Sequence, residues 1–157
     1  MREVTEIETL VHQTILWVTG KPIIGEQHYC LSRLTEVIVE LDDPVLTSHV
    51  KKLPIEDIEK AVNKVFDDHM INWGRVVALF AFCAKMALLH KDHPGQLKDI
   101  EARFTLAIFS QTAWWIEKQG GWQNFLTFAS SEKKNELLPW TLFGVCGSIL
   151  IYIICKS

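Results

Sequence analysis

Apolar residues recur at the three-to-four-residue spacing of α-helices along most of the chain. This pattern predicts helices over about residues 2–18, 26–41, 55–66, 76–89 and 96–118, and a further short helix from residue 122. Short segments with glycine, proline or paired aspartates separate them, at 19–25, 42–44, 90–95 and 120–121. The sequence therefore predicts an all-α fold.

The helix predicted over 76–89 differs from the others because it is apolar on every side. Lys85 is its one charged residue. Such a helix either lies at the centre of a protein or crosses a membrane, and this one is short for a membrane span. We therefore expect it to be the hub around which the other helices pack.

A second charge-free run, Leu137 to Cys155, follows the helical segments. As a helix its 19 residues would cover the hydrocarbon core of a bilayer, because a helix rises about 1.5 Å per residue. Its glycine, serine and threonine residues dilute the hydrophobicity, which leaves a buried core helix as the alternative. The sequence predicts a helical domain over 1–134 and a C-terminal transmembrane tail anchor over 135–157.

Composition and charge narrow the classes of function. The 157 residues suit one domain, and 16 basic against 19 acidic residues argue against nucleic-acid binding. Four cysteines without a CxxC pair favour reduced thiols in a cytosol-facing protein over a disulfide scaffold. His90 and His93 have the spacing of a ligand pair, but they flank charged residues before Pro94 and indicate a solvated helix end. No metal site and no cofactor are expected.

The residues before the apolar helix, Asn72-Trp73-Gly74-Arg75, form the clearest candidate site. Asn72 can cap the helix or hydrogen-bond a peptide that crosses it, and Gly74 lets another backbone come close. Arg75 is a cation in a first helical turn, where the helix dipole disfavours it. It is therefore either a solvated arginine or one that pairs with a carboxylate from outside the chain.

Two motifs in this order resemble the Bcl-2 family of apoptosis regulators. Residues 67–84, centred on Asn72-Trp73-Gly74-Arg75, look like the first homology motif of that family. Residues 115–122, Trp-Ile-Glu-Lys-Gln-Gly-Gly-Trp, look like the second. The resemblance implies a Bcl-2-like bundle of about seven or eight helices around a buried central hairpin, with a tail helix behind it. Three tryptophans of the motifs are expected in the core: Trp73, Trp115 and Trp122.

In that family a groove accepts an amphipathic death-motif helix (BH3 helix) from a partner. The resemblance implies that Arg75 pairs with the aspartate of this helix and that Asn72 and Gly74 join the contact. It also implies an apolar floor and a wall residue: Val62, Phe66, Val77, Ala78 and Phe82, with Leu41 in the upper wall. The partners would be pro-apoptotic family members of the Bim-like and the Bak- or Bax-like kinds, with homodimerisation left open.

Two departures from the family pattern indicate a branch. Ile38 and Val39 stand where the third homology motif has glycine and aspartate, so the second helix should insert poorly into the groove of another member. The short segment 19–25 replaces the long regulatory loop of cellular survival proteins. Together they suggest a compact viral survival homologue that inhibits apoptosis. The lysines around the tail favour the mitochondrial outer membrane, with the endoplasmic reticulum as the alternative.

Two other classes of function stay open at this point. Residues 71–80 are close to the Bax-like and Bak-like effectors, which permeabilise membranes. An enzyme would need a nucleophile, and the sequence offers only Cys30 near His28, with no motif for an orienting carboxylate. We therefore expect a binding module and not an enzyme.

Overall fold

The computed structural model describes residues 2–40 and 44–134, which form helices and no strands. The elements are α1 (Arg2–Val18), α2 (Leu31–Glu40), α3 (Pro44–Val50), a 3-10 turn η1 (Ile55–Asp57), α4 (Ile58–Val65), α5 (Trp73–Leu89), α6 (Pro94–Lys118) and α7 (Gln123–Lys134). The all-α prediction is confirmed for these residues. The predicted tail helix over 135–157 and the predicted wall residue Leu41 lie outside the described residues.

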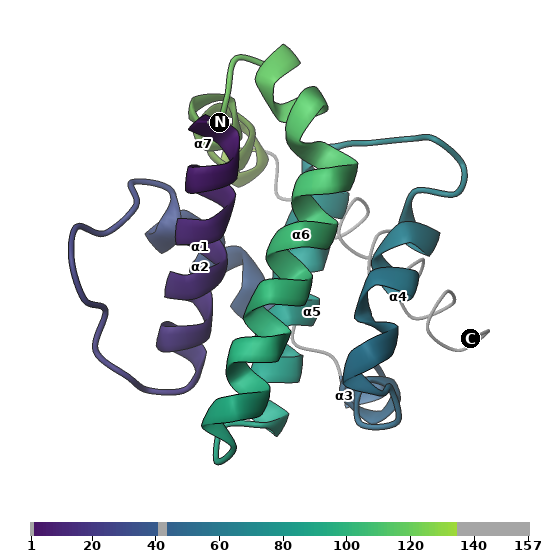
Figure 1. The fold of residues 1–157 in the computed structure, drawn as a ribbon. Helices are drawn as coiled ribbons and strands as arrows, with labels where there is room; N and C mark the ends of the chain where they lie inside the picture. Colours follow the sequence, from purple (N-terminus) through teal and green to yellow (C-terminus); the bar gives the residue numbers. More distant parts are fainter. Residues whose placement is uncertain (1, 41–43, 135–157) are drawn as a thin grey trace.

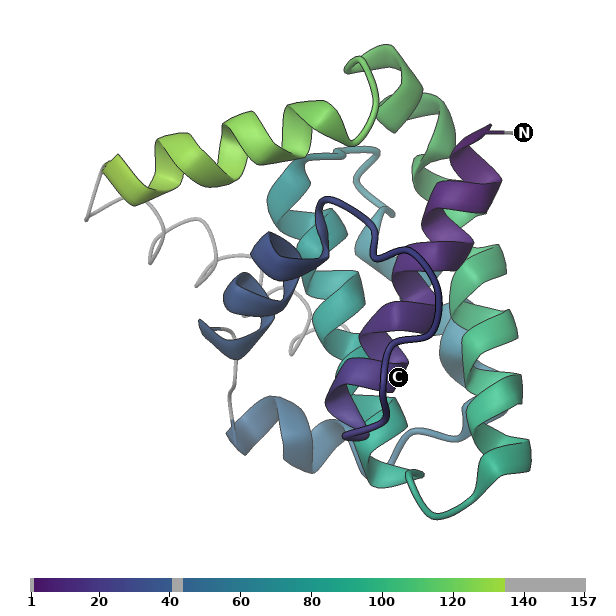
Figure 2. The same cartoon turned by 90° about the vertical axis from the view of Figure 1, so that its left-hand side faces the viewer.

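The apolar helix α5 is the hub of the bundle, as its sequence predicts. It packs against α1, α2, α3 and α6, and only Lys85, Leu88 and Leu89 along it are not buried. In Figure 1, α6 lies in front of α5, and α1 and α4 flank this pair. In Figure 2, α2 and α3 lie on the side of α5 that faces away from α6, and α7 crosses one end of the bundle. The two helices α5 and α6 are the central hairpin.

The N-terminal helix α1 is held by an apolar stripe and by polar contacts at its edges. Ile7, Leu10 and Val11 are fully buried and face the core formed with α5 and α6. On the surface, His12 Nδ1 lies 2.7 Å from a carboxylate oxygen of Glu101 in α6. Burial of each apolar side chain, Ile7, Leu10 and Val11, contributes about 1.5–3 kcal/mol. The predicted bounds of this helix are confirmed.

The second helix begins later than predicted, at Leu31 instead of Glu26. Gly25, just before the predicted start, has a left-handed backbone with φ 87° and belongs to the loop. The buried side-chain amide of Gln13 hydrogen-bonds the backbone of the following loop residues. Its Nε2 donates to the Glu26 carbonyl (3.0 Å), and its Oε1 accepts the His28 N–H (2.9 Å). A backbone satisfied in this way has no need of helical hydrogen bonds.

Within residues 2–40 and 44–134, no helix combines the length and the hydrophobicity needed to cross a membrane. This includes α5, which is apolar but has 17 residues. Its role as a buried central helix, and not as a span, agrees with the prediction from its length.

Candidate ligand-binding site

The motif Asn72-Trp73-Gly74-Arg75 forms the start of α5, and Asn72 caps it. The Oδ1 of Asn72 accepts a hydrogen bond of 2.8 Å from the backbone N–H of Arg75, and the Asn72 backbone is extended (φ −149°, ψ 166°). This is the geometry of an N-cap residue. The cap therefore sets the beginning of α5 at Trp73, three residues before the apolar run, and fixes the place of Gly74 and Arg75 in the first turn.

The side chain of Arg75 is buried, and the chain itself supplies its hydrogen-bond acceptors. Its Nη1 donates to the carbonyl oxygens of Val65 (3.0 Å) and Met70 (2.8 Å). Nη1 and Nη2 also donate to the two carboxylate oxygens of Asp68, over 2.6 and 2.7 Å. Fork-to-fork pairs of this kind are among the stronger ion pairs. The guanidinium thus ties the end of α4 and the α4–α5 loop to the first turn of α5.

Asp68 supplies a carboxylate for Arg75 from within the chain, an arrangement beside the two that the sequence suggests, a solvated arginine and an outside partner. The sequence shows an unfavourable cation in a first helical turn, and the structure compensates it with Asp68 from the loop that precedes the helix. The chain reverses between Val65 and Asn72, so residues seven apart meet side to side. In this structure the bidentate partner of Arg75 is therefore internal, and pairing with a carboxylate from a partner helix stays a prediction.

Asp68 sits in a tight turn that its own carboxylate helps to hold. Its Oδ1 accepts the backbone N–H of Met70 over 3.1 Å, and His69 between them has a left-handed backbone with φ 61°. The hydrogen bonds from Arg75, then the one from Met70, hold the pKa of the Asp68 carboxyl well below its usual range. Half of the Asp68 side chain is exposed to solvent.

The Asp68–Arg75 pair should make stability depend on acid. Because the pKa of Asp68 is lowered in the folded protein, the pair stabilises the fold above the ordinary value of 3.8 and progressively less as the pH falls below it. Wild type should therefore exceed Asp68→Asn in stability at pH 6, and the gap should shrink toward pH 3. Urea unfolding followed by circular dichroism measures this gap. Asp67→Asn is the control, and an identical gap for both variants would contradict the prediction.

The five residues predicted for the apolar floor all lie in the hydrophobic core. Two belong to α4 and its C-terminal end, and three belong to α5. None is more than 5 % exposed: Val62, Phe66, Val77, Ala78 and Phe82. Phe82 packs edge-on against Phe104 of α6, with ring centroids 5.0 Å apart. The structure brings these residues together but shows them as core side chains rather than as an exposed surface.

An aromatic cluster joins the two sequence motifs, a contact that the sequence does not reveal. The ring of Trp73 at the start of α5 lies 5.0 Å from Trp115, 5.4 Å from Trp122 and 5.6 Å from Phe125 (centroid distances). Phe80 adds an edge-on contact to Trp122 at 5.7 Å. Trp73 and Trp122 are buried, as predicted for core residues, and Trp115 is partly buried. The two motifs, which lie apart in the sequence, therefore pack directly against each other in the fold.

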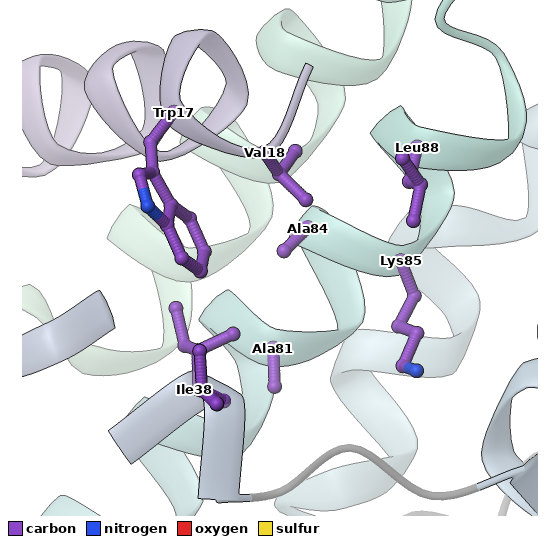
Figure 3. A pocket seen from close by; sticks show the side chains of 8 residues that line it. Trp17, Val18, Ile38, Ala81, Ala84, Lys85 and Leu88 are labelled. Carbon is purple, nitrogen blue, oxygen red and sulfur yellow. The ribbon is translucent and has the colours of Figure 1, made fainter. Parts of the chain in front are cut away.

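The cavities on the described surface include two that lie away from the predicted site. The first has about 160 Å³ and lies between α1, α2 and α5; in Figure 3, Trp17 points from α1 toward Ile38 of α2, with Ala81 and Ala84 of α5 beside them. Its further lining residues are Val18, Val39, Lys85 and Leu88. The second has about 320 Å³ and adjoins the second motif: Glu6, Tyr29, Glu117, Gly120, Gly121, Trp122 and Gln123. Neither cavity is lined by a residue predicted to contact a ligand.

The described bundle and its motifs match a known family. Residues 30–122 match the model of the apoptosis regulator proteins of the Bcl-2 family, and this range is more than half of the chain. The chain belongs to the Bcl-2 family. The matched range holds α2 to α6 and ends at Trp122, so it contains both sequence motifs and leaves α1 outside.

Individual Bcl-2 family relatives support the assignment. Bcl-2-like protein 1 of Homo sapiens is 31 % identical over 120 residues, which cover 68 % of this chain and 51 % of that protein. Bcl-2-related protein A1 of Bos taurus is 36 % identical over 95 residues (57 % and 53 %), and apoptosis regulator BAX of Homo sapiens is 34 % identical over 77 residues (48 % and 40 %). The chain spans two fifths to about half the length of these curated relatives.

The environment of Cys30 in this Bcl-2 family member does not suit a nucleophile. Burial raises the pKa of the Cys30 thiol to about 12, and the carboxylate of Glu6 adds to the shift. Its Sγ lies 3.4 Å from the carbonyl oxygen of Trp122, while His28 Nδ1 accepts the backbone N–H of Cys30 instead of facing the sulfur. A neutral thiol with no base beside it is a poor nucleophile.

Proposed function

We propose that the chain is an anti-apoptotic member of its family, which sequesters the BH3 helices of pro-apoptotic relatives in a groove beside the first turn of α5. The family includes both anti-apoptotic and pro-apoptotic proteins, so membership alone leaves the direction open. The composition of α2 supports the anti-apoptotic direction.

In α2 the two positions that a BH3 ligand needs most are changed. Ile38 takes the place of a glycine and is buried against the core, at 7 % exposure. Val39 takes the place of an aspartate, and its side chain is 60 % exposed. A valine cannot pair with an arginine in another protein, and an isoleucine keeps two helices further apart than a glycine does. The chain is thus better suited to accept a BH3 helix than to provide one.

The start of α5 supports the accepting role. A helix-in-groove ligand needs a close approach and a charge partner. Gly74 offers the first because it has no side chain, and Arg75 offers the second through a guanidinium aligned for bidentate pairing. The proposed contact residues beside Asn72, Gly74 and Arg75 remain those that the sequence predicts: Val62, Phe66, Val77, Ala78 and Phe82, with Leu41.

The similarity to apoptosis regulator BAX favours a second candidate, a membrane-permeabilising effector. That activity would require α2 to leave the bundle and to pair with α2 of another molecule. The residues Leu31, Leu34 and Ile38 hold α2 in the core, and Val39 removes the carboxylate that such a pairing would use. For these reasons we propose the membrane-permeabilising effector only as the second candidate function.

Location and origin complete the proposal. The charge-free run between Leu137 and Cys155 supports attachment to an intracellular membrane, and its lysine flanks support the mitochondrial outer membrane. The connection between α1 and α2 has only twelve residues, Thr19–Cys30, which supports a compact protein of the viral type. Homodimerisation is compatible with the proposal and is not needed for it.

One variant should abolish both binding and protection. Gly74→Glu adds bulk and a negative charge where the aspartate of a ligand helix would approach, so we expect the affinity for a BH3 peptide to fall at least ~100-fold. Gly95→Glu is the matched control, because Gly95 is an exposed helical glycine with open space around it. Calorimetric titration measures the affinity. Protection of isolated mitochondria from cytochrome c release, tested with the same proteins, measures the activity.

Three outcomes separate the candidates. Binding and protection by wild type and Gly95→Glu, with neither for Gly74→Glu, support the proposal. Release of cytochrome c by the wild-type protein alone would favour the effector. Equal affinity of wild type and Gly74→Glu would exclude the groove at α5. Because Gly74 is buried, circular dichroism checks the folding of the variant, and a peptide with alanine in place of its apolar anchor residues repeats the test on unaltered protein.

A further inference from the structure

The guanidinium of Arg75 is already occupied before any ligand arrives. Asp68 holds it in a bidentate pair, with the carbonyl oxygens of Val65 and Met70 as further acceptors. The carboxylate of a partner helix would need the same Nη1 and Nη2 donors. A second carboxylate beside Asp68 would also be repelled, since like charges that share a site disfavour each other.

Asp68 is also the outer member of the pair. The side chain of Arg75 is 6 % exposed, whereas that of Asp68 is 50 % exposed. Solvent therefore reaches the carboxylate of Asp68 and hardly reaches the guanidinium behind it. An incoming carboxylate meets Asp68 first, and the guanidinium becomes accessible only when Asp68 moves away.

The turn around Asp68 is built so that it can move. His69 holds a left-handed backbone (φ 61°), a conformation that is strained for a residue with a side chain. Two hydrogen bonds to Met70 hold this turn. The Met70 N–H donates to Asp68, and Arg75 donates to the Met70 carbonyl. Both Met70 and Asp68 are exposed, so no packed core opposes a rearrangement. Movement of Asp68 away from Arg75 also breaks its hydrogen bond with the Met70 N–H, one of these two contacts, so the turn rearranges with it.

We propose that Asp68 is a specificity-determining residue of the BH3 site, an internal competitor whose carboxylate must leave Arg75 before the aspartate of a partner helix can bind there. This inference rests on the proposed function and adds to it the part that this chain plays in choosing ligands.

The competition changes what a ligand aspartate contributes. In the wild-type protein, binding exchanges one carboxylate on Arg75 for another, so the net gain is only the difference between two similar pairs. A ligand without the aspartate leaves Asp68 in place and loses little. The wild-type protein should therefore discriminate weakly between BH3 helices with and without their aspartate. Without Asp68, the same aspartate would gain a full ion pair.

A double-mutant cycle tests this competition. Wild type and Asp68→Asn are each titrated by calorimetry with a BH3 peptide and with the same peptide carrying asparagine for its aspartate. We expect the ratio of the two dissociation constants to be about threefold for wild type and at least tenfold larger for Asp68→Asn, a difference of about 1.4 kcal/mol in coupling. The change should come from tighter binding of the aspartate peptide.

Asp67→Asn is the matched control, because Asp67 is the exposed neighbour in the same loop and the variant removes the same charge. It should keep the wild-type ratio. If the ratio is the same for wild type and Asp68→Asn, or if Asp68→Asn binds the aspartate peptide more weakly, Asp68 orients Arg75 and does not compete for it.

A measurement without any peptide separates this inference from the proposed function. The Nε–H resonance of Arg75 is followed by nuclear magnetic resonance during titration with sodium acetate, against sodium chloride at equal ionic strength. Acetate should shift the resonance in Asp68→Asn and leave it unchanged in wild type and Asp67→Asn. An equal shift in all three proteins would overturn the internal competition. Failure of every peptide to bind, with the acetate result as expected, would overturn the proposed function alone.

Discussion

Replacement of Trp122 by alanine is expected to lower the free energy of unfolding by about 3–5 kcal/mol, the range for a large aromatic side chain removed from a core. The side chain is fully buried, and its ring contacts those of Trp73, Phe80 and Phe125. Domains of this size are typically stable by about 5–15 kcal/mol, so the variant would lose a large share of its stability. Urea unfolding followed by circular dichroism measures the loss.

Two further variants test whether the cause is packing. Trp114→Ala should change the stability by less than about 0.5 kcal/mol, because Trp114 is 58 % exposed although it stands in the neighbouring helix α6. Trp122→Phe should cost less than Trp122→Ala, since the indole N–H of Trp122 makes no hydrogen bond that its loss could break. Equal unfolding midpoints for Trp122→Ala and wild type would show that the cluster does not hold the two motifs together.

Replacement of Arg75 by alanine should destabilise the fold by about 2–4 kcal/mol, because the hydrogen bonds of a buried charged donor are lost. The sequence alone suggests little change, since an arginine in a first helical turn opposes the helix dipole. The structure reverses that expectation: Arg75 is 5 % exposed and binds the carbonyl oxygens of Val65 and Met70 as well as Asp68. Thermal unfolding at neutral pH measures the effect.

Arg33→Ala is the control for Arg75→Ala. Arg33 forms an exposed pair with Glu36 one helical turn away, and such pairs contribute about 0.2–0.5 kcal/mol. Affinity for a BH3 peptide should fall about tenfold to a hundredfold in Arg75→Ala, because Asp68 is then left without its cation and repels the aspartate of the ligand. It is measured well below the unfolding temperature and should stay unchanged in Arg33→Ala. A stability loss as small as that of Arg33→Ala would mean that the Asp68 pair does not form in solution.

Most of the helices could be predicted from the sequence because their signals are local, whereas α3 (Pro44–Val50) is too short for a periodic pattern and was not predicted. The apolar stripe of α1 and the all-apolar surface of α5 depend only on the order of residues, and both agree with the structure. The predicted start of α2 was wrong because the true start depends on Gln13 of α1, whose side-chain amide hydrogen-bonds the loop before α2. Local periodicity carries no signal for a polar side chain that reaches across the bundle.

The candidate site shows the same limit. The cap by Asn72 and the core position of Trp73 follow from residue type and place along the helix, and the structure confirms both. The pairing of Arg75 with Asp68 depends on how the α4–α5 loop turns, and two adjacent aspartates, Asp67 and Asp68, gave no reason to choose one. The cavity between α1, α2 and α5 likewise needs three distant segments to meet.

The pairing of α1 with α6 has a consequence for the newly made chain. The helix α1 ends at Val18 and α6 begins at Pro94, so about 75 residues must leave the ribosome before α1 meets the start of its partner. At synthesis rates of about 5–20 residues per second this takes about 4–15 s. Until α5 and α6 have both emerged, the stripe with Ile7, Leu10 and Val11 is covered incompletely. Helix α1 of the nascent chain is therefore an apolar segment suited to chaperones until the hairpin of α5 and α6 arrives.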